Sequence, residues 1–203
     1  MSSEPDDPGA PAGDLPRLRA GVGQVERSDV VILGASFAGV EVLLQLQRRV
    51  SRPLKITVVD RQRSHGYIPL VHERLCGRLP PEDSELPTAR FVDSLPGARF
   101  VHDEVVTLDP DGRVVQLASG RRLKARFLVV ALGSALAPPA AVTGGEHLLA
   151  HKEGAQLDEA AQRLATLLSS EQGEPRVVVA GGGISGVELA GELVHLRRER
   201  PTG

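Results

Sequence analysis

The chain has 203 residues, enough for one large or two small domains, and its formal net charge is −2. This balance argues against nucleic acid or an acidic membrane surface as the main partner. Aromatic residues make up only 2% of the chain, so the core must be built from Val, Leu, Ala and Ile. The lone Cys76 excludes an internal disulfide and fits a reducing compartment, and no apolar run approaches the ~20 residues that cross a bilayer.

The first part of the chain predicts a leader followed by a βαβ unit. Residues 1–28 are rich in Pro, Gly, Ser and acidic residues and lack the basic-then-apolar order of a signal peptide, so we expect a disordered leader. Apolar runs predict strands over 30–33 and 54–60, with a helix over 37–49 between them. A helix that connects two apolar strands favours a parallel pair.

The middle of the chain predicts an antiparallel insertion. Prolines break up residues 61–97, which we expect to be irregular apart from a short helix over 88–94. A small antiparallel sheet is then expected as an insertion over about 99–126, before the apolar residues 127–132 return to the main sheet. The strands predicted for this insertion cover residues 100–102, 105–108, 114–117 and 121–123.

The last part predicts a linker and a second nucleotide-binding unit. Residues 138–150 contain two prolines and two glycines and are interpreted as a linker. Leucine and alanine recur at helical spacing over 157–168, a strand is expected over 176–180, and a helix then extends to about Glu199.

The first of two glycine-rich turns predicts a dinucleotide site. Gly34 makes the tight turn after a strand, and Gly39 lets the following helix pack closely. The middle position, usually glycine, is Ser36, which crowds a diphosphate but can donate to it. Asp60 ends the next strand 21 residues after Gly39, a spacing typical of a carboxylate that binds a ribose 2′-OH. The alternative is a βα turn that binds nothing, with Asp60 as a solvated strand end.

The second turn has the complete three-glycine pattern, with Gly181, Gly183 and Gly186. The acidic residue that separates NAD from NADP is expected about twenty residues further on, beyond the end of this sequence. Two such turns, each after a β-branched strand, predict two dinucleotides and electron transfer between them.

These elements predict an α/β fold class. A Rossmann-like parallel sheet with a small antiparallel insertion occupies residues 29–137. The start of a second Rossmann-like domain, an incomplete NAD(P)H-binding domain, occupies residues 151–203.

Several segments of the chain resemble the two-dinucleotide-domain FAD- and NAD(P)-binding oxidoreductases, and within them the type II NADH dehydrogenases. They are Ile56 to Arg61, His65-Gly-Tyr67-Ile-Pro69-Leu70, the strand that ends in Ala131-Leu132-Gly133, where the family has Ala-Thr-Gly, and Gly186-Val-Glu188-Leu-Ala-Gly191-Glu192. The resemblance implies FAD at the first turn and NADH or NADPH at the second. It further implies that hydride passes to the flavin and electrons pass on to a small-molecule acceptor such as a quinone.

The resemblance also implies which residues contact the cofactors; no metal site is expected. Glu188 matches a family carboxylate near the contact between nicotinamide and flavin and is the tentative catalytic residue, although the helix dipole also favours a glutamate there. The expected NAD(P)H contacts are Gly181, Gly183, Ile184 and Gly186. The expected FAD contacts are Gly34, Ser36, Phe37, Ala38, Gly39, Asp60, Arg61, Val105, Ala131, Leu132 and Gly133.

Intact family members are longer, so the resemblance covers their N-terminal half and implies a truncated enzyme, with the missing half or a second copy as partner. The alternative is a non-catalytic nucleotide-binding remnant. A cysteine-dependent flavoprotein peroxidase that uses Cys76 is a further alternative. The expected location is the cytoplasm, peripherally on the inner membrane face in intact homologues.

Overall fold

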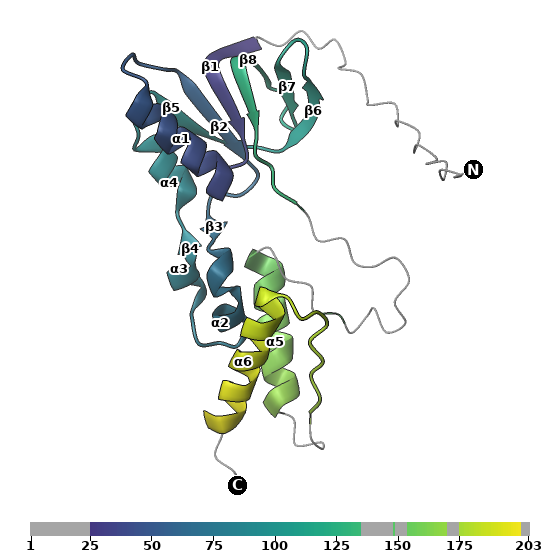
Figure 1. Ribbon diagram of the computed structural model, residues 1–203. Helices are drawn as coiled ribbons and strands as arrows, with labels where there is room; N and C mark the ends of the chain where they lie inside the picture. The colour runs from purple at the N-terminus through teal and green to yellow at the C-terminus, as the bar shows by residue number, and fades with distance from the viewer. Residues whose placement is uncertain (1–24, 135–147, 149–153, 170–174, 200–203) are drawn as a thin grey trace, which may run out of the picture.

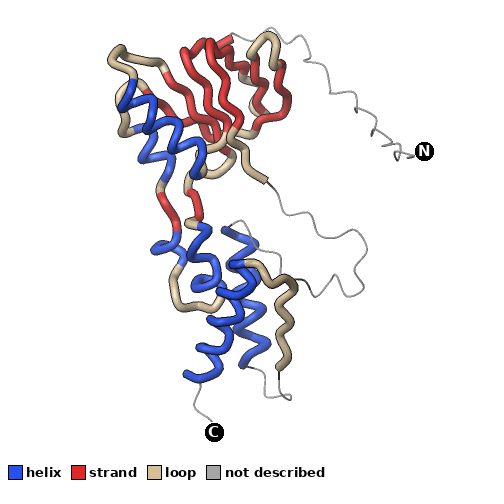
Figure 2. Tube along the Cα trace, viewed as in Figure 1, coloured by secondary structure: helices blue, strands red, loops and turns tan. Residues whose placement is uncertain are grey.

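The computed structural model describes residues 25–134, 148, 154–169 and 175–199. A sheet with two helices on one face lies at one end, and a group of helices lies at the other (Figure 1). Two short strands, β3 and β4, connect the two parts (Figure 2). No helix in the described ranges is long and apolar enough to cross a membrane.

The main sheet has six strands in the order β5-β2-β1-β8-β7-β6. β5, β2, β1 and β8 are parallel, and β7 and β6 continue the same sheet in antiparallel pairing. The chain leaves β1 toward β2 on one side and later pairs β8 on the other, so a topological switch point lies beside β1. The strands are β1 (Val25–Leu33), β2 (Ile56–Asp60), β5 (Ala98–His102), β6 (Val105–Asp109), β7 (Val114–Leu117) and β8 (Arg122–Val130).

Both faces of the central strands β1 and β2 are buried over residues 30–33 and 56–59, which explains why these stretches are almost continuously apolar. Helices α1 (Phe37–Arg49) and α4 (Thr88–Asp93) cover one face, where Ile32, Val58 and Leu43 belong to one core. On the other face, Val31 and Leu117 belong to a second core, which includes the β6–β7 hairpin. The predicted α/β class is therefore what the structure shows, and the helix expected over 88–94 is confirmed as α4.

The boundary of the predicted leader was wrong. β1 begins at Val25, and residues 25–28 pair in parallel with residues 122–125 of β8; residues 1–24 are outside the described ranges. The Ser28 and Thr57 hydroxyls are hydrogen-bonded at 2.8 Å. Polar residues here are ordered because they pair with the sheet, which composition does not show.

The predicted insertion was also placed wrongly. β5 pairs in parallel with β2 and belongs to the main sheet, so the insertion contains only β6 and β7 before β8 begins. The strands predicted over 121–123 and 127–132 form one strand, because β8 pairs with β7 at its start and with β1 along its length.

Residues 61–97 contain more structure than predicted. Their helix α2 packs with two later helices around a shared core that includes Leu75, Leu157 and Leu164. The additional elements are β3 (His65–Gly66), the 3₁₀ turn η1 (Ile68–Leu70), α2 (Val71–Leu75), α3 (Pro81–Ser84) and β4 (Glu85–Leu86). The later helices are α5 (Gly154–Ser169) and α6 (Ile184–Glu199).

An ion-pair cluster at the start of β1 predicts acid sensitivity. Hydrogen bonds from Arg121, and then from Arg99, lower the pKa of Glu26 from 4.5 to about 2. The folded-state pKa of Glu26 lies below the unfolded value, so its ion pairs with the two arginines stabilise the fold above pH 4.5. This stabilisation is lost as the pH falls toward 2. Glu26→Gln is expected to cost about 1 kcal/mol at pH 7, since the cluster is partly solvated. Urea unfolding of both proteins should show this difference shrinking through that window; a constant difference would contradict the assignment.

Candidate functional site

The first glycine turn lies at the carboxyl edge of the parallel strands. Gly34 has φ +98°, and a Cβ atom there would clash with the carbonyl of Ala131 at the end of β8. A Cβ on Gly39 would clash with the Gly34 carbonyl. The Gly34 N–H donates to the Val59 carbonyl at 2.8 Å, and the Ala131 N–H donates to the Leu33 carbonyl at 2.7 Å. The ends of three strands therefore meet at this turn, as a dinucleotide crevice requires.

Asp60, the predicted ribose ligand, lies at the end of β2 against this turn. Its carboxylate accepts hydrogen bonds from the N–H groups of Ala35 at 2.7 Å and Gln62 at 2.9 Å. An ionised carboxylate has about four acceptor positions, so two bonds leave capacity for a ribose hydroxyl. The residue therefore shapes the turn, and its role as a ribose ligand stays a prediction.

The hydroxyl of Ser36 is hydrogen-bonded to His65 Nε2 at 3.1 Å and does not cap α1. The first N–H groups of a helix have no partner within it, so this arrangement leaves those of α1 available to an anion. The Phe37 ring lies edge-on to the His65 and Tyr67 rings, with centroid distances of 4.9 and 5.6 Å. Burial lowers the pKa of His65, while the nearby charge of Asp60 acts in the opposite direction.

His65 was not among the predicted site residues. Its role could have been predicted from the hydroxyl of Ser36 in the middle position of the turn. A side chain at that position needs a hydrogen-bond partner that turns it away from the diphosphate. The turn thus fits a dinucleotide despite Ser36, since the main-chain cradle stays open.

The other predicted FAD contacts lie around the same edge of the sheet. Ala38 is in the first turn of α1, and Leu132 and Gly133 follow β8, with Gly133 at φ +72°. Arg61 follows β2, and its carbonyl lies 2.9 Å from His102 Nε2. Val105 begins β6, three residues after β5 ends.

The second glycine turn is formed only in part. Gly181 has φ +115°, and a Cβ on Gly186 would clash with the Gly181 carbonyl, so the close approach typical of such a turn is present. The expected strand over 176–180 was wrong: these residues are irregular, and Val178 is 88% exposed. A strand requires a hydrogen-bonded neighbour, and none is described alongside this segment.

Acidic residues of α6 contact α2 and the residues just after it. Glu188 lies 3.6 Å from His72 Nδ1, and Arg78 donates to both carboxylate oxygens of Glu192 at 2.8 Å. Gly183 precedes α6, and Ile184, its first residue, is 78% exposed. Glu188 is therefore near a titratable partner on α2, and its catalytic role stays a prediction.

Cys76 is a buried residue of the helical core and is 8% exposed. Burial, and then the charge of Glu192, raises its pKa to about 11, so it is a thiol at neutral pH. A peroxidase cysteine requires an accessible thiolate, which this environment disfavours.

This environment predicts a slow thiol reaction. We expect the native protein to react with Ellman's reagent on the order of a hundredfold more slowly than the urea-unfolded chain at pH 8, because the thiolate is scarce and covered. Stopped-flow absorbance at 412 nm measures both rates, and equal rates would restore the peroxidase alternative.

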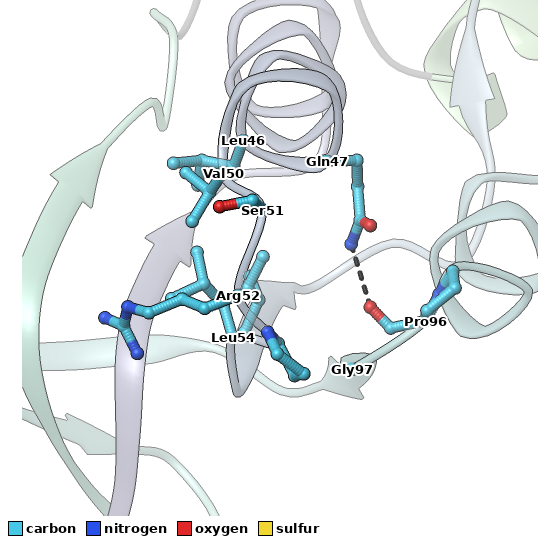
Figure 3. A pocket seen from close by; sticks show the side chains of 10 residues that line it. Leu46, Gln47, Val50, Ser51, Arg52, Leu54, Pro96 and Gly97 are labelled. Atoms are coloured by element: carbon cyan, nitrogen blue, oxygen red, sulfur yellow. Dashed lines mark hydrogen bonds between the residues drawn. The ribbon is translucent and has the colours of Figure 1, made fainter.

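A cavity of about 250 Å³ between the end of α1 and the start of β2 is separate from these turns. Leu46, Val50 and Leu54 contribute to its wall, and Gln47 donates to the Pro96 carbonyl at 2.9 Å across it (Figure 3). It lies at the opposite end of β2 from Asp60 and is not part of the dinucleotide site.

The Rossmann-like sheet with its glycine turn at the switch point defines an α/β protein of the dinucleotide-binding class. The sequence matches the family described as pyridine nucleotide-disulphide oxidoreductase over residues 28–201, and the chain belongs to that family. The resemblance inferred from its motifs is confirmed.

Relatives and solved structures agree with this assignment. A type II NADH:quinone oxidoreductase of Staphylococcus aureus is 26% identical over 176 residues, which are 83% of this chain and 43% of that relative's length. NDH2 of Plasmodium falciparum superimposes with a TM-score of 0.68 at 15% identity, covering 87% of this chain and 38% of that one. Sulfide:quinone oxidoreductase of Aquifex aeolicus gives 0.63 at 22% identity, covering 72% and 33%. The chain thus spans less than half the length of these proteins.

Proposed function

We propose that this chain supplies the FAD site of an NAD(P)H oxidoreductase that passes electrons to a quinone or similar acceptor. When bound, FAD accepts hydride from NAD(P)H and hands on the electrons. The observation that supports the proposal best is the cradle at the first turn, where Gly34 and Gly39 permit close backbone packing and the N-terminus of α1 is uncapped.

The residues of this edge have distinct proposed roles. Main-chain N–H groups ahead of Phe37 bind the diphosphate, and Asp60 binds the adenosine ribose. His65 holds the Ser36 hydroxyl aside. At the second turn, the start of α6 binds NADH or NADPH and Glu188 orients the nicotinamide. The missing half of such an enzyme, or a second copy, is the proposed partner, with the complex working in the cytoplasm or at the inner membrane face.

A second candidate is a nucleotide-binding protein without turnover. The irregular segment 176–180 favours it, because the second glycine turn has no strand behind it to place a nicotinamide dinucleotide. The first turn is unaffected by this difference.

FAD binding tests the proposal. We expect calorimetric titration of the purified chain to show heat with FAD, and the complex to be yellow and to bleach when NADH is added. A protein that binds ADP but stays colourless when FAD is added supports the second candidate. Well-folded protein that binds neither FAD nor ADP contradicts both.

A substitution at Asp60 localises the binding. Asp60→Asn is expected to lower FAD affinity about tenfold, since a charged hydrogen bond to the ribose is weakened. Asp93→Asn is the matched control, because Asp93 likewise accepts a backbone N–H, from Phe100 at 2.7 Å, on another part of the surface. If both variants bind FAD like the wild type, Asp60 is not a ribose ligand.

A further inference from the structure

A groove of about 380 Å³ crosses the sheet toward the amino ends of β1 and β2, away from the glycine turn. It contains residues from β1, from the residue before β2, from the hairpin turn before β7, and from β8. Five of its side chains are cationic and one is acidic: Arg27, Lys55, Arg113, Lys124, Arg126 and Asp29.

The cations of this groove are not neutralised within the described residues. Carboxylates pair with four other arginines, Arg74, Arg78, Arg99 and Arg121, whereas none of these five side chains forms an ion pair in the described ranges. The carboxylate of Asp29 is engaged by the backbone N–H of Lys55 at 2.9 Å. The chain as a whole has a net charge of −2, so this concentration of positive charge is local.

The fold fixes the backbone of several of these residues. Arg113 has φ +51°, a left-handed conformation that favours glycine or asparagine, and its carbonyl accepts a hydrogen bond from Ala125 at 3.0 Å. Lys124 and Arg126 flank Ala125 on β8. The Arg126 guanidinium lies 5.4 Å from the centre of the Phe127 ring. The fold therefore brings Arg113, Lys124 and Arg126 to the same groove.

We propose that this groove binds the phosphate group of a small anionic ligand, at a site separate from the dinucleotide turn. Arginine presents paired N–H donors that match phosphate oxygens, and lysine adds a point charge. The proposal does not depend on the proposed oxidoreductase activity, because it uses different residues at the other end of the strands.

Nuclear magnetic resonance titration of the full chain with inorganic pyrophosphate tests the site. The amide signals of Arg27, Lys55 and Lys124 are expected to shift, with an affinity at least about tenfold weaker in the double variant Lys55→Glu/Arg126→Glu. Arg197→Glu/Arg198→Glu on α6 changes the total charge equally and is expected to bind like the wild type. Circular dichroism verifies that both variants are folded.

The outcomes separate a site from general attraction. Equal weakening in both double variants, or shifts at Gly34 to Phe37 alone, would overturn the proposal. A parallel arm measures sedimentation with vesicles of phosphatidylcholine and phosphatidylglycerol. Loss of vesicle binding in the groove variant alone assigns the phosphate to a lipid headgroup, whereas pyrophosphate binding without vesicle binding assigns it to a soluble ligand.

Discussion

Gly34→Ala is expected to lower the free energy of unfolding by about 3 kcal/mol, and to abolish FAD binding by any protein that remains folded. Two effects add at this position. The φ of +98° is strained for any residue with a Cβ, and the new methyl group would overlap the Ala131 carbonyl where β1 and β8 end together. Urea unfolding followed by circular dichroism measures the loss.

Gly120→Ala separates these two effects. Gly120 has φ +84° in the turn between β7 and β8, but nothing lies within 4 Å of the added methyl group. Only the conformational strain applies, so a loss of about 1 kcal/mol is expected. Equal losses in the two variants would show that the close packing of the first turn against β8 contributes nothing.

Arg74→Met is expected to cost about 3 kcal/mol, because it removes the buried cation that joins three elements. The Arg74 side chain is 3% exposed and donates to Asp158 on α5 at 2.8 Å and to Glu85 on β4 at 3.1 Å. It also donates to the Ser84 hydroxyl at 3.2 Å. Without it, two carboxylates at the edge of the helical core lose their partner.

Arg78→Met is the control for this prediction. Arg78 also pairs with a carboxylate, Glu192 on α6, but its side chain is 41% exposed. Solvent screens such a pair, so a change of at most about 1 kcal/mol is expected. Thermal and urea unfolding of the two variants compare them directly, and an equal effect would mean that burial does not strengthen the Arg74 network.

The candidate site was predictable where it is local in the chain. An apolar strand, Gly34, Gly39 and an amphipathic helix form a continuous segment, and the structure places them as the pattern indicated. The contact between Ser36 and His65 joins residues 29 apart across an irregular segment, so no periodicity indicates it. The sequence likewise did not show that Asp60 accepts a hydrogen bond from the turn, because only the folded structure places the Ala35 N–H beside its carboxylate.

By itself, the sequence determined the family, the α/β class, the first βαβ unit and the first glycine turn, because backbone preference and hydrophobic period are local properties. Tertiary structure decided which strands pair. Polar residues 25–28 joined the sheet because β8 extends beside them, whereas the β-branched residues 177–179 formed no strand because no described neighbour completes their hydrogen bonds. A strand is stabilised by its partner, and a single segment does not show whether that partner is there.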